Sequence, residues 1–556
     1  MIQRGAPVGM RHDSTVAAGG TAGSRLSLGA VRAGKVAAME IRDVAVVGLG
    51  TMGAGIAEVF ARAGIGVVAI ESDPQALRTG LGTLDASLSR AVSRGRLDAR
   101  QQAEVRARVR PAAAFADAAA VDLAVEVVPE RMEIKRQVFA ELDRVCSPDA
   151  ILATNTSSLS VTSIAAATRH PGRVVGMHFF NPAPVMGLVE VVTTVLSDDR
   201  VPAAAADLAR RLGKTPVQVG DRAGFIANAL LLPYLNHAAG LLETGYATAA
   251  DIDKAATAGI GLPMGPLALL DLIGVDTSLS ILEVLHAEFG VARYCPAPLL
   301  RRLVTAGRTG RKAGRGIYSY PGGQAAPAAR SAADVDGIGG PGAAPDTVTV
   351  IGSADEHEAE VASALASAGI NVTRNAAHPT ELVLIVAESG KPVLPAALAA
   401  GRAGQAVGLH LPGGMRTSGL AELVATSLTV DPTMQAATAL AARLGLTVVR
   451  APDRPGFLVG ALLYPHLADA VRMTRDGYAS AADIDTAMTL GCGYPRGPFE
   501  LIDAAGAADV LAGLRAMYSA YGCPAFAPPP LLAEHAAAGI DFAVASRGRP
   551  EPASAG

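Results

Sequence analysis

The sequence predicts an α/β domain with a parallel sheet, then an all-helical domain, then a shortened repeat of both. Three observations predict this. Residues 44–56 join an apolar strand pattern to a helical pattern through closely spaced glycines, strand and helix patterns alternate from residue 40 to about 220, and short sequence motifs recur 232 residues later. Alternation of strand and helix patterns along the chain favours a parallel sheet covered by helices. A constant offset between recurring motifs indicates an internal duplication.

The first predicted strand and helix carry a dinucleotide-binding fingerprint. Gly48, Gly50 and Gly53 have the spacing G-x-G-x-x-G. In this fingerprint the first glycine permits a tight turn, the second lets the backbone approach a pyrophosphate, and the third lets helix and strand pack closely. The next apolar run, residues 67–70, ends at Glu71, where a carboxylate suits the ribose hydroxyls of NAD. The alternative is a Gly-rich turn followed by a surface glutamate.

Composition bounds the class of protein. The 556 residues predict three or four domains, and a formal net charge of −3 gives no support for nucleic-acid binding. The four cysteines are scattered without a C-x-x-C pair, which fits a reducing cytoplasm better than a disulfide framework or a zinc site. No uncharged apolar run is long enough to predict a membrane span. The closest, residues 225–242, contains two Asn, a Pro and a His and is interpreted as a buried helix.

The changes in sequence pattern predict the domain boundaries. Residues 1–38 are rich in Gly, Ala, Ser and Arg with one acidic residue, a composition typical of a transit peptide. Because they lack the apolar segment of a secretory signal, the favoured interpretation is a disordered N-terminal extension, or a translation start at Met39. The predicted parts after it are an NAD-binding Rossmann-type α/β domain (39–221), an all-α domain (222–320), a linker rich in Pro, Gly and Ala (321–345), a shortened, degenerate Rossmann-like segment (346–452) and a second all-α domain (453–556).

Polar residues follow several predicted strands of the first domain. An apolar run ends at each of three places: at Glu130, at the turn containing Asn155 and Ser157, and at His178. Glu190 lies on the strand that follows His178. Ligands of parallel sheets bind beyond the carboxyl ends of strands. An imidazole paired with a carboxylate has a fixed tautomer and suits a general base near neutral pH. The alternative for any single histidine is a structural or surface role.

Residues 40–320 resemble the L-3-hydroxyacyl-CoA dehydrogenase family. Six motifs in the same order carry the resemblance: Val47-Gly-Leu-Gly-Thr-Met-Gly53, Asn155-Thr-Ser-Ser-Leu159, His178-Phe-Phe-Asn-Pro182, Leu188-Val-Glu190, Gly224-Phe-Ile-Ala-Asn228 and Gly314-Arg-Gly-Ile-Tyr318.

The resemblance implies the site residues. The catalytic set is His178 as base, Glu190 as its acidic partner, Ser157 and Asn228. The residues that would bind NAD are Gly48, Gly50, Thr51, Met52, Gly53, Glu71, Glu130, Lys135 and Asn155. The residues that would bind the substrate are Ser157, Asn181 and Asn228, with Ser87 and Arg94 near the CoA phosphates, and Arg96 is the alternative to Arg94. No metal is implied.

The resemblance also implies the reaction. It is the reversible, NAD-dependent oxidation of (S)-3-hydroxyacyl-CoA to 3-ketoacyl-CoA, in fatty-acid β-oxidation, butanoate metabolism or aromatic-acid degradation. The length of the acyl group, and whether it carries a second carboxylate, stay open. The alternative is a catalytically weak NAD-binding or scaffold protein of the same fold. A dehydrogenase of free hydroxy acids with a lysine base is disfavoured by the motif that begins at His178.

The second half has lost much of this chemistry. It has no G-x-G-x-x-G motif, and Gly460 stands where the first half has Asn228. Ser389, His410 and Glu422 keep the spacing of the first-half residues, so they form either a second site or a remnant. The favoured interpretation is that the second helical domain serves packing. The apolar helices 225–242 and 457–471 would then form an internal pseudo-dimer, with further homo-oligomers left open.

Overall fold

The computed structural model describes residues 40–321, 344–352, 356–374, 382–413 and 419–543. The predicted disordered extension and most of the predicted linker lie outside the described residues. Within the described ranges, no helix is both long and apolar enough to cross a membrane.

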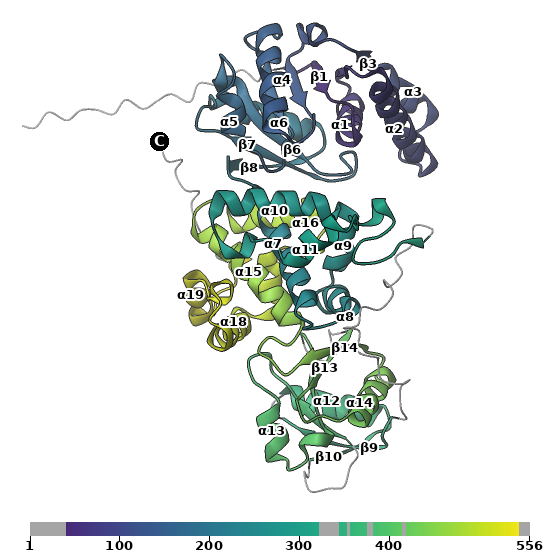
Figure 1. Ribbon diagram of the computed structural model, residues 1–556, viewed down its shortest axis with the longest axis vertical. Helices are drawn as coiled ribbons and strands as arrows, with labels where there is room; N and C mark the ends of the chain where they lie inside the picture. The colour runs from purple at the N-terminus through teal and green to yellow at the C-terminus, as the bar shows by residue number, and fades with distance from the viewer. Residues whose placement is uncertain (1–39, 322–343, 353–355, 375–381, 414–418, 544–556) are drawn as a thin grey trace, which may run out of the picture. The chain divides into compact units, whose positions relative to one another are not determined.

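The first α/β domain, drawn in purple and blue in Figure 1, is built on a mainly parallel sheet. The sheet has eight strands in the order β3-β2-β1-β4-β5-β6-β7-β8. Its strands are β1 Asp43–Val47, β2 Gly66–Ile70, β3 Val109–Ala112, β4 Leu123–Glu126, β5 Ile151–Thr154, β6 Val174–Phe179, β7 Leu188–Thr193 and β8 Thr215–Gly220. Its helices are α1 Thr51–Arg62, α2 Pro74–Ser93, α3 Ala99–Ala107, α4 Met132–Val145, α5 Val161–Ala165 and α6 Arg200–Arg211. The central strands are buried apolar runs, as expected of a sheet covered on both faces.

The predicted parallel sheet is confirmed except at one pairing. β6 and β7 run antiparallel, with His178 opposite Glu190. The eight residues between these strands are too few for the crossover that a parallel pair needs. The sequence pattern also missed β3 and β8, the two edge strands. Both contain a proline, which sheets accept mainly at their edges, and neither is a continuous apolar run.

An all-helical region follows the first sheet. Its helices are α7 Ala227–Glu243, α8 Ala249–Lys254, α9 Pro266–Ile273, α10 Val275–Phe289 and α11 Pro298–Thr305. α7 is buried over most of its length, which explains an apolar run that includes Asn236 and His237. The Asn236 amide meets backbone groups of Cys295 and Ala297, so burial does not leave this side chain unpaired.

The second half repeats this order with a smaller sheet. Six strands have the order β10-β9-β11-β12-β13-β14: β9 Thr347–Ile351, β10 Asn371–Thr373, β11 Val383–Val386, β12 Ala406–His410, β13 Leu420–Ala425 and β14 Thr447–Pro452. The helices are α12 Glu356–Ser367, α13 Leu394–Ala399, α14 Asp431–Arg443, α15 Val459–Arg475, α16 Ala481–Cys492, α17 Pro498–Ala505, α18 Ala507–Tyr521 and α19 Pro530–Ala538.

Backbone geometry supports the duplication. β7 and β13, β8 and β14, and α7 and α15 are each related by 232 residues. Phe225 and Phe457 have positive φ angles of 48° and 47°, and they are the only non-glycine residues with positive φ in the described part of the chain. Since bulky residues seldom adopt this conformation, its occurrence at equivalent positions indicates a shared ancestral turn.

The helices of the two halves share one apolar core, which contains buried residues of both α7 and α15. Polar contacts also join them. The Nε2 atom of His237 lies 2.9 Å from the carbonyl oxygen of Ala461, and Arg293 pairs with Asp469 at 2.7 Å. The helical domains therefore pack as one body within the described residues.

Candidate active site

The turn between β1 and α1 has the shape that a pyrophosphate requires. Gly48 has φ 94°, and a Cβ atom there would lie 2.8 Å from the carbonyl oxygen of Val127. A Cβ atom on Gly53 would lie 1.9 Å from the carbonyl oxygen of Gly48. A Cβ atom on Gly50 would meet no described atom within 4 Å, so open space lies at the N-terminus of α1. These residues fit a bound dinucleotide phosphate.

Glu71 is held beside this turn. It follows β2, and its carboxylate accepts hydrogen bonds from the backbone N–H groups of Leu49 at 3.2 Å and Asp73 at 3.3 Å. Thr51 and Met52, also predicted at the cofactor site, begin α1. The geometry places a carboxylate next to the glycine turn.

A buried ionic network connects β4 to α4. The Lys135 ammonium is 1% exposed and lies 2.9 Å from Glu126 Oε1 and 3.2 Å from Glu130 Oε2. Glu126, fully buried on β4, also accepts a hydrogen bond from the Thr154 hydroxyl at 2.7 Å. Sequence analysis did not select Glu126. A glutamate inside an apolar strand, nine residues before a lysine on a helix, was the available signal.

Glu130 organises the turn after β5. Its Oε1 atom accepts hydrogen bonds from the Thr156 hydroxyl at 2.6 Å and from the backbone N–H groups of Ser157 at 3.0 Å and Ser158 at 3.1 Å. Burial acts to raise the pKa of Glu130, but the Lys135 charge and these hydrogen bonds outweigh it and hold the pKa below its ordinary value. Glu130 is therefore an ionised acceptor that fixes the serine turn.

His178 is paired with Glu190 across β6 and β7. The His178 Nδ1 atom lies 2.7 Å from Glu190 Oε2, while Glu190 Oε1 accepts hydrogen bonds from the backbone N–H groups of Ile226 and Ala227, each at 3.0 Å. Because the carboxylate only accepts, this network assigns the proton of the neutral imidazole to Nδ1. Nε2 makes no hydrogen bond to any described residue, so its lone pair is available.

The same carboxylate caps α7 and so positions Asn228. The Asn228 amide lies in the first turn of that helix and donates to the backbone carbonyl of Ser157 at 3.4 Å. Asn155 links neighbouring strand ends, since its Oδ1 atom accepts from the backbone N–H of Phe179 at 2.8 Å. The site is thus assembled from the ends of β4, β5 and β6, from β7, and from the start of α7.

The remaining predicted residues lie apart from this network. Ser87 is on α2, and Arg94 and Arg96 follow that helix on its exposed side. Asn181 is exposed in the connection between β6 and β7. No hydrogen bond between described residues joins these four to His178 or Glu190.

The corresponding place in the second half is filled. His410 Nδ1 lies 2.5 Å from Glu422 Oε2, but its Nε2 lies 3.0 Å from the Ser389 hydroxyl, and the Tyr464 hydroxyl lies 3.4 Å from that same oxygen. A Cβ atom on Gly460 would lie 2.8 Å from the Tyr464 ring. The glycine that replaces Asn228 therefore makes room for a tyrosine whose hydroxyl reaches Ser389, the residue that holds the second histidine.

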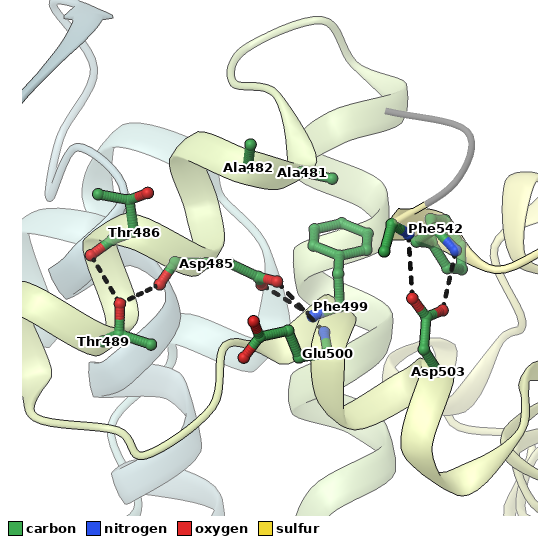
Figure 2. A pocket seen from close by; sticks show the side chains of 10 residues that line it. Ala481, Ala482, Asp485, Thr486, Thr489, Phe499, Glu500, Asp503 and Phe542 are labelled. Atoms are coloured by element: carbon green, nitrogen blue, oxygen red, sulfur yellow. Dashed lines mark hydrogen bonds between the residues drawn. The ribbon is translucent and has the colours of Figure 1, made fainter. Parts of the chain in front are cut away.

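A hollow of about 460 Å³ lies elsewhere, on α16 and α17 of the second half (Figure 2). Its carboxylates are already engaged. Asp485 accepts from the backbone N–H of Phe499 at 2.9 Å, and Asp503 accepts from those of Phe542 at 2.8 Å and Ala543 at 3.0 Å. The hollow contains none of the predicted site residues.

Comparison with known proteins identifies the family. A model of the 3-hydroxyacyl-CoA dehydrogenase NAD-binding domain matches residues 43–222, and a model of the C-terminal domain of the same enzymes matches residues 224–320 and again 456–541. The chain belongs to the 3-hydroxyacyl-CoA dehydrogenase family. It is an NAD-dependent enzyme that oxidises 3-hydroxyacyl-CoA.

Relatives of this dehydrogenase fall into two lengths. A 3-hydroxybutyryl-CoA dehydrogenase of Mycobacterium tuberculosis is 46% identical over 50% of this chain and 99% of its own length. The 3-hydroxyadipyl-CoA dehydrogenase of Escherichia coli K12 is 34% identical over 90% of this chain and 98% of its own. A crystal structure described as 3-hydroxybutyryl-CoA dehydrogenase from the same organism covers 90% of this chain and 99% of its own, with 32% identity and a TM-score of 0.75.

Proposed function

We propose that the first half alone performs the oxidation, with His178 as general base. The observation that supports this is the asymmetry of the two imidazoles. His178 Nδ1 is held by Glu190 while Nε2 has no described partner, whereas His410 Nε2 is held by Ser389. A positioned base with an available lone pair contributes roughly 10²–10⁴ to a rate.

In the proposed mechanism His178 Nε2 takes the proton of the substrate 3-hydroxyl. NAD, when bound at the glycine turn, supplies the hydride acceptor chemistry. Glu190 stabilises the resulting imidazolium, and its contacts with the N-terminus of α7 keep it in place. Ser157 and Asn228 orient the substrate oxygen. In the reverse direction the imidazolium returns its proton to the alkoxide.

Other residues are proposed to hold the ligands. Glu71 would accept from the adenosine ribose, and the network of Glu130 and Lys135 would fix the serine turn beside the nicotinamide. Ser87 with Arg94 would meet the CoA phosphates, because α2 and the turn after it carry an exposed cation that matches an anionic ligand.

For the acyl group we propose two candidates. A short 3-hydroxybutyryl group is supported by the 46% identical relative of half this length. A 3-hydroxyadipyl group, with its distal carboxylate, is supported by the relative that shares both halves. A 3-hydroxyadipyl substrate would favour aromatic-acid degradation as the pathway in which the enzyme acts. The four cysteines, all free thiols, fit a cytoplasmic enzyme.

The second helical domain is proposed to act as the partner in an internal pseudo-dimer. Two contacts recur with the halves exchanged. The Arg222 guanidinium lies 5.0 Å from the centre of the Tyr478 ring, and that of Arg454 lies 5.5 Å from the Tyr246 ring. Such reciprocal pairs are what a twofold interface produces.

The proposal is tested by NADH oxidation with acetoacetyl-CoA and with 3-oxoadipyl-CoA. The wild type should reduce at least one of them. His178→Ala should lose roughly 10²–10⁴ in kcat, while His410→Ala should stay near wild type. If both substitutions lower kcat equally, the assignment of chemistry to the first half is wrong. An inactive wild type that binds NADH would favour the scaffold alternative.

A further inference from the structure

The second half contacts the wall of the proposed active site through α16. Phe180 lies against the catalytic imidazole, with 4.5 Å between the ring centres of Phe180 and His178. A Cβ atom on Gly491, near the end of α16, would lie 3.2 Å from Phe180 Cε1 and 2.6 Å from Leu188 Cδ2. Since these residues bracket the connection from β6 to β7, the helix packs directly on the segment that carries the base.

Leu490 extends this contact along the same connection. A Cβ atom on Gly187 would lie 3.5 Å from Leu490 Cδ2, so the leucine side chain packs against the residue before β7. Both ends of the connection therefore rest on the last turn of α16.

Two further second-half side chains, those of Cys492 and Tyr478, lie within electrostatic range of the Glu190 carboxylate. Burial, and then the charge of Glu190, raise the pKa of the Cys492 thiol and of the Tyr478 phenol. Both groups therefore stay neutral near pH 7 and add no charge that competes for the imidazole.

We propose that Gly491 is a positioning residue for the dehydrogenase reaction, through which α16 of the second half holds Phe180 against His178. The copy without a glycine turn then completes the active site of the other copy. This inference rests on the proposed role of His178.

The packing explains why position 491 is a glycine. Glycine is a poor residue inside a helix, so its presence there needs a local reason. Any side chain at this position meets the buried Leu188 side chain and the Phe180 ring at less than ordinary contact distance. Because the ring already lies on His178, a larger residue pushes it toward the imidazole.

The duplication supplies a matched control at Gly259, which is 232 residues earlier. A Cβ atom there would lie 2.8 Å from Leu420 Cδ2 and 2.9 Å from Val459 Cγ2. Leu420 begins β13, as Leu188 begins β7. An alanine at Gly259 therefore causes a similar steric conflict in the second half, where Ser389 already holds the Nε2 atom of His410.

The test compares full-length wild type, Gly491→Ala and Gly259→Ala with the better acyl-CoA substrate. We expect Gly491→Ala to lower kcat about tenfold, since small misplacements of a catalytic group are costly, with the KM for NADH unchanged. Gly259→Ala should keep kcat within about twofold, and the two variants should have similar melting temperatures. If both glycine variants have the same kcat, the proposal is wrong.

A double-mutant cycle separates positioning from general destabilisation. Phe180→Leu removes the ring that the new methyl group displaces. In that background Gly491→Ala should therefore lower kcat little further, whereas additive losses of kcat from the two substitutions would overturn the proposal. If Gly491→Ala does not fold, Leu490→Ala should lower kcat with the KM for NADH unchanged, and a wild-type kcat there would overturn it equally. An inactive wild type would instead refute the proposed function.

Discussion

At the scale of single residues, the two histidine–glutamate pairs differ at one nitrogen atom, the histidine Nε2. Both histidines present Nδ1 to a glutamate, and both glutamates receive two backbone N–H groups from the following helix. Only His178 has an Nε2 atom without a described partner. Loss of an amide side chain in the second half admits Tyr464 and accompanies the Ser389 contact, so a few substitutions suffice to close that site.

Glu190→Gln should abolish most activity while the fold is kept. The glutamine oxygen can still accept from Ile226 and Ala227, which leaves its amino group facing His178 Nδ1. Nδ1 must then accept a hydrogen bond, so the imidazole proton moves to Nε2 and the base is lost. We expect kcat to fall roughly 10³-fold with NADH binding intact.

The control for this substitution is Glu422→Gln, which makes the same change beside His410, whose Nε2 atom Ser389 already holds. Its kcat should match that of the wild type. A Glu190→Gln enzyme that retains more than about a tenth of the wild-type kcat would show that tautomer control is unimportant here.

At this scale, sequence could predict the residues that belong to short patterns. The glycine turn and the His178–Glu190 pair were accessible because each is local or lies on neighbouring strands. Glu126 was missed because it lies within an apolar strand, and its partner Lys135 is fixed by folding rather than by spacing. The Tyr464 contact depends on space left by Gly460, one turn earlier on α15, and by Gly513 on α18, and no linear pattern reports that these two glycines meet the same ring.

At the scale of elements, equivalent aspartates cap equivalent helices. Asp253 accepts from the backbone N–H groups of Leu267 and Ala268 at the start of α9, and Asp485 accepts from those of Phe499 and Glu500 at the start of α17. Asp253 lies on α8 and Asp485 on α16, so each aspartate caps a helix that follows its own in the chain. This tertiary cap tethers consecutive helices in both halves.

Asp253→Asn should reduce the pH dependence of stability. Burial raises the pKa of Asp253 to about 6, although hydrogen bonds from Leu267 and Tyr318 oppose the shift. A folded-state pKa above the unfolded value means that the carboxyl group stabilises the fold at low pH and loses that contribution as pH rises through about 6. The asparagine side chain cannot titrate, so the variant lacks this pH-dependent contribution to the free energy of unfolding.

The measurement is the melting temperature of both proteins at pH values on either side of that pKa. Wild type should gain more stability than Asp253→Asn as the pH falls from neutral toward the unfolded-state value. Equal pH dependence of the two proteins would exclude the buried carboxyl group as a source of the effect.

Element boundaries were predictable where an apolar run is long, as in α7, and poorly predictable where pairing with another strand decides the structure. Sequence alone does not predict β3, because its residues lack apolar alternation, and the segment becomes a strand by pairing with β2. The direction of β7 was set by the short connection that precedes it, which the alternation of strands and helices does not reveal.

At the scale of the whole molecule, the second half has retained the surfaces that face the first. α15 buries Leu462 and Leu467 in the core shared with α7, and Tyr246 donates to the backbone carbonyl of Phe457 at 2.5 Å. Its nucleotide turn, by contrast, is gone from the sequence. Retention of the interface without the cofactor site is consistent with a structural role for the second half.

Deletion of residues 330–556 should therefore expose the apolar face of α7. A relative of half this length matches about half of this chain over 99% of its own length, so the truncated chain corresponds to such a relative. The exposed face should make it either insoluble or newly dimeric, because burying that surface is the main gain from association. Light scattering coupled to gel filtration distinguishes these outcomes, and the dimer should retain NADH binding. A soluble, fully active monomer would show that the first half needs neither an internal nor an external partner, and would also remove the basis for α16 acting on His178.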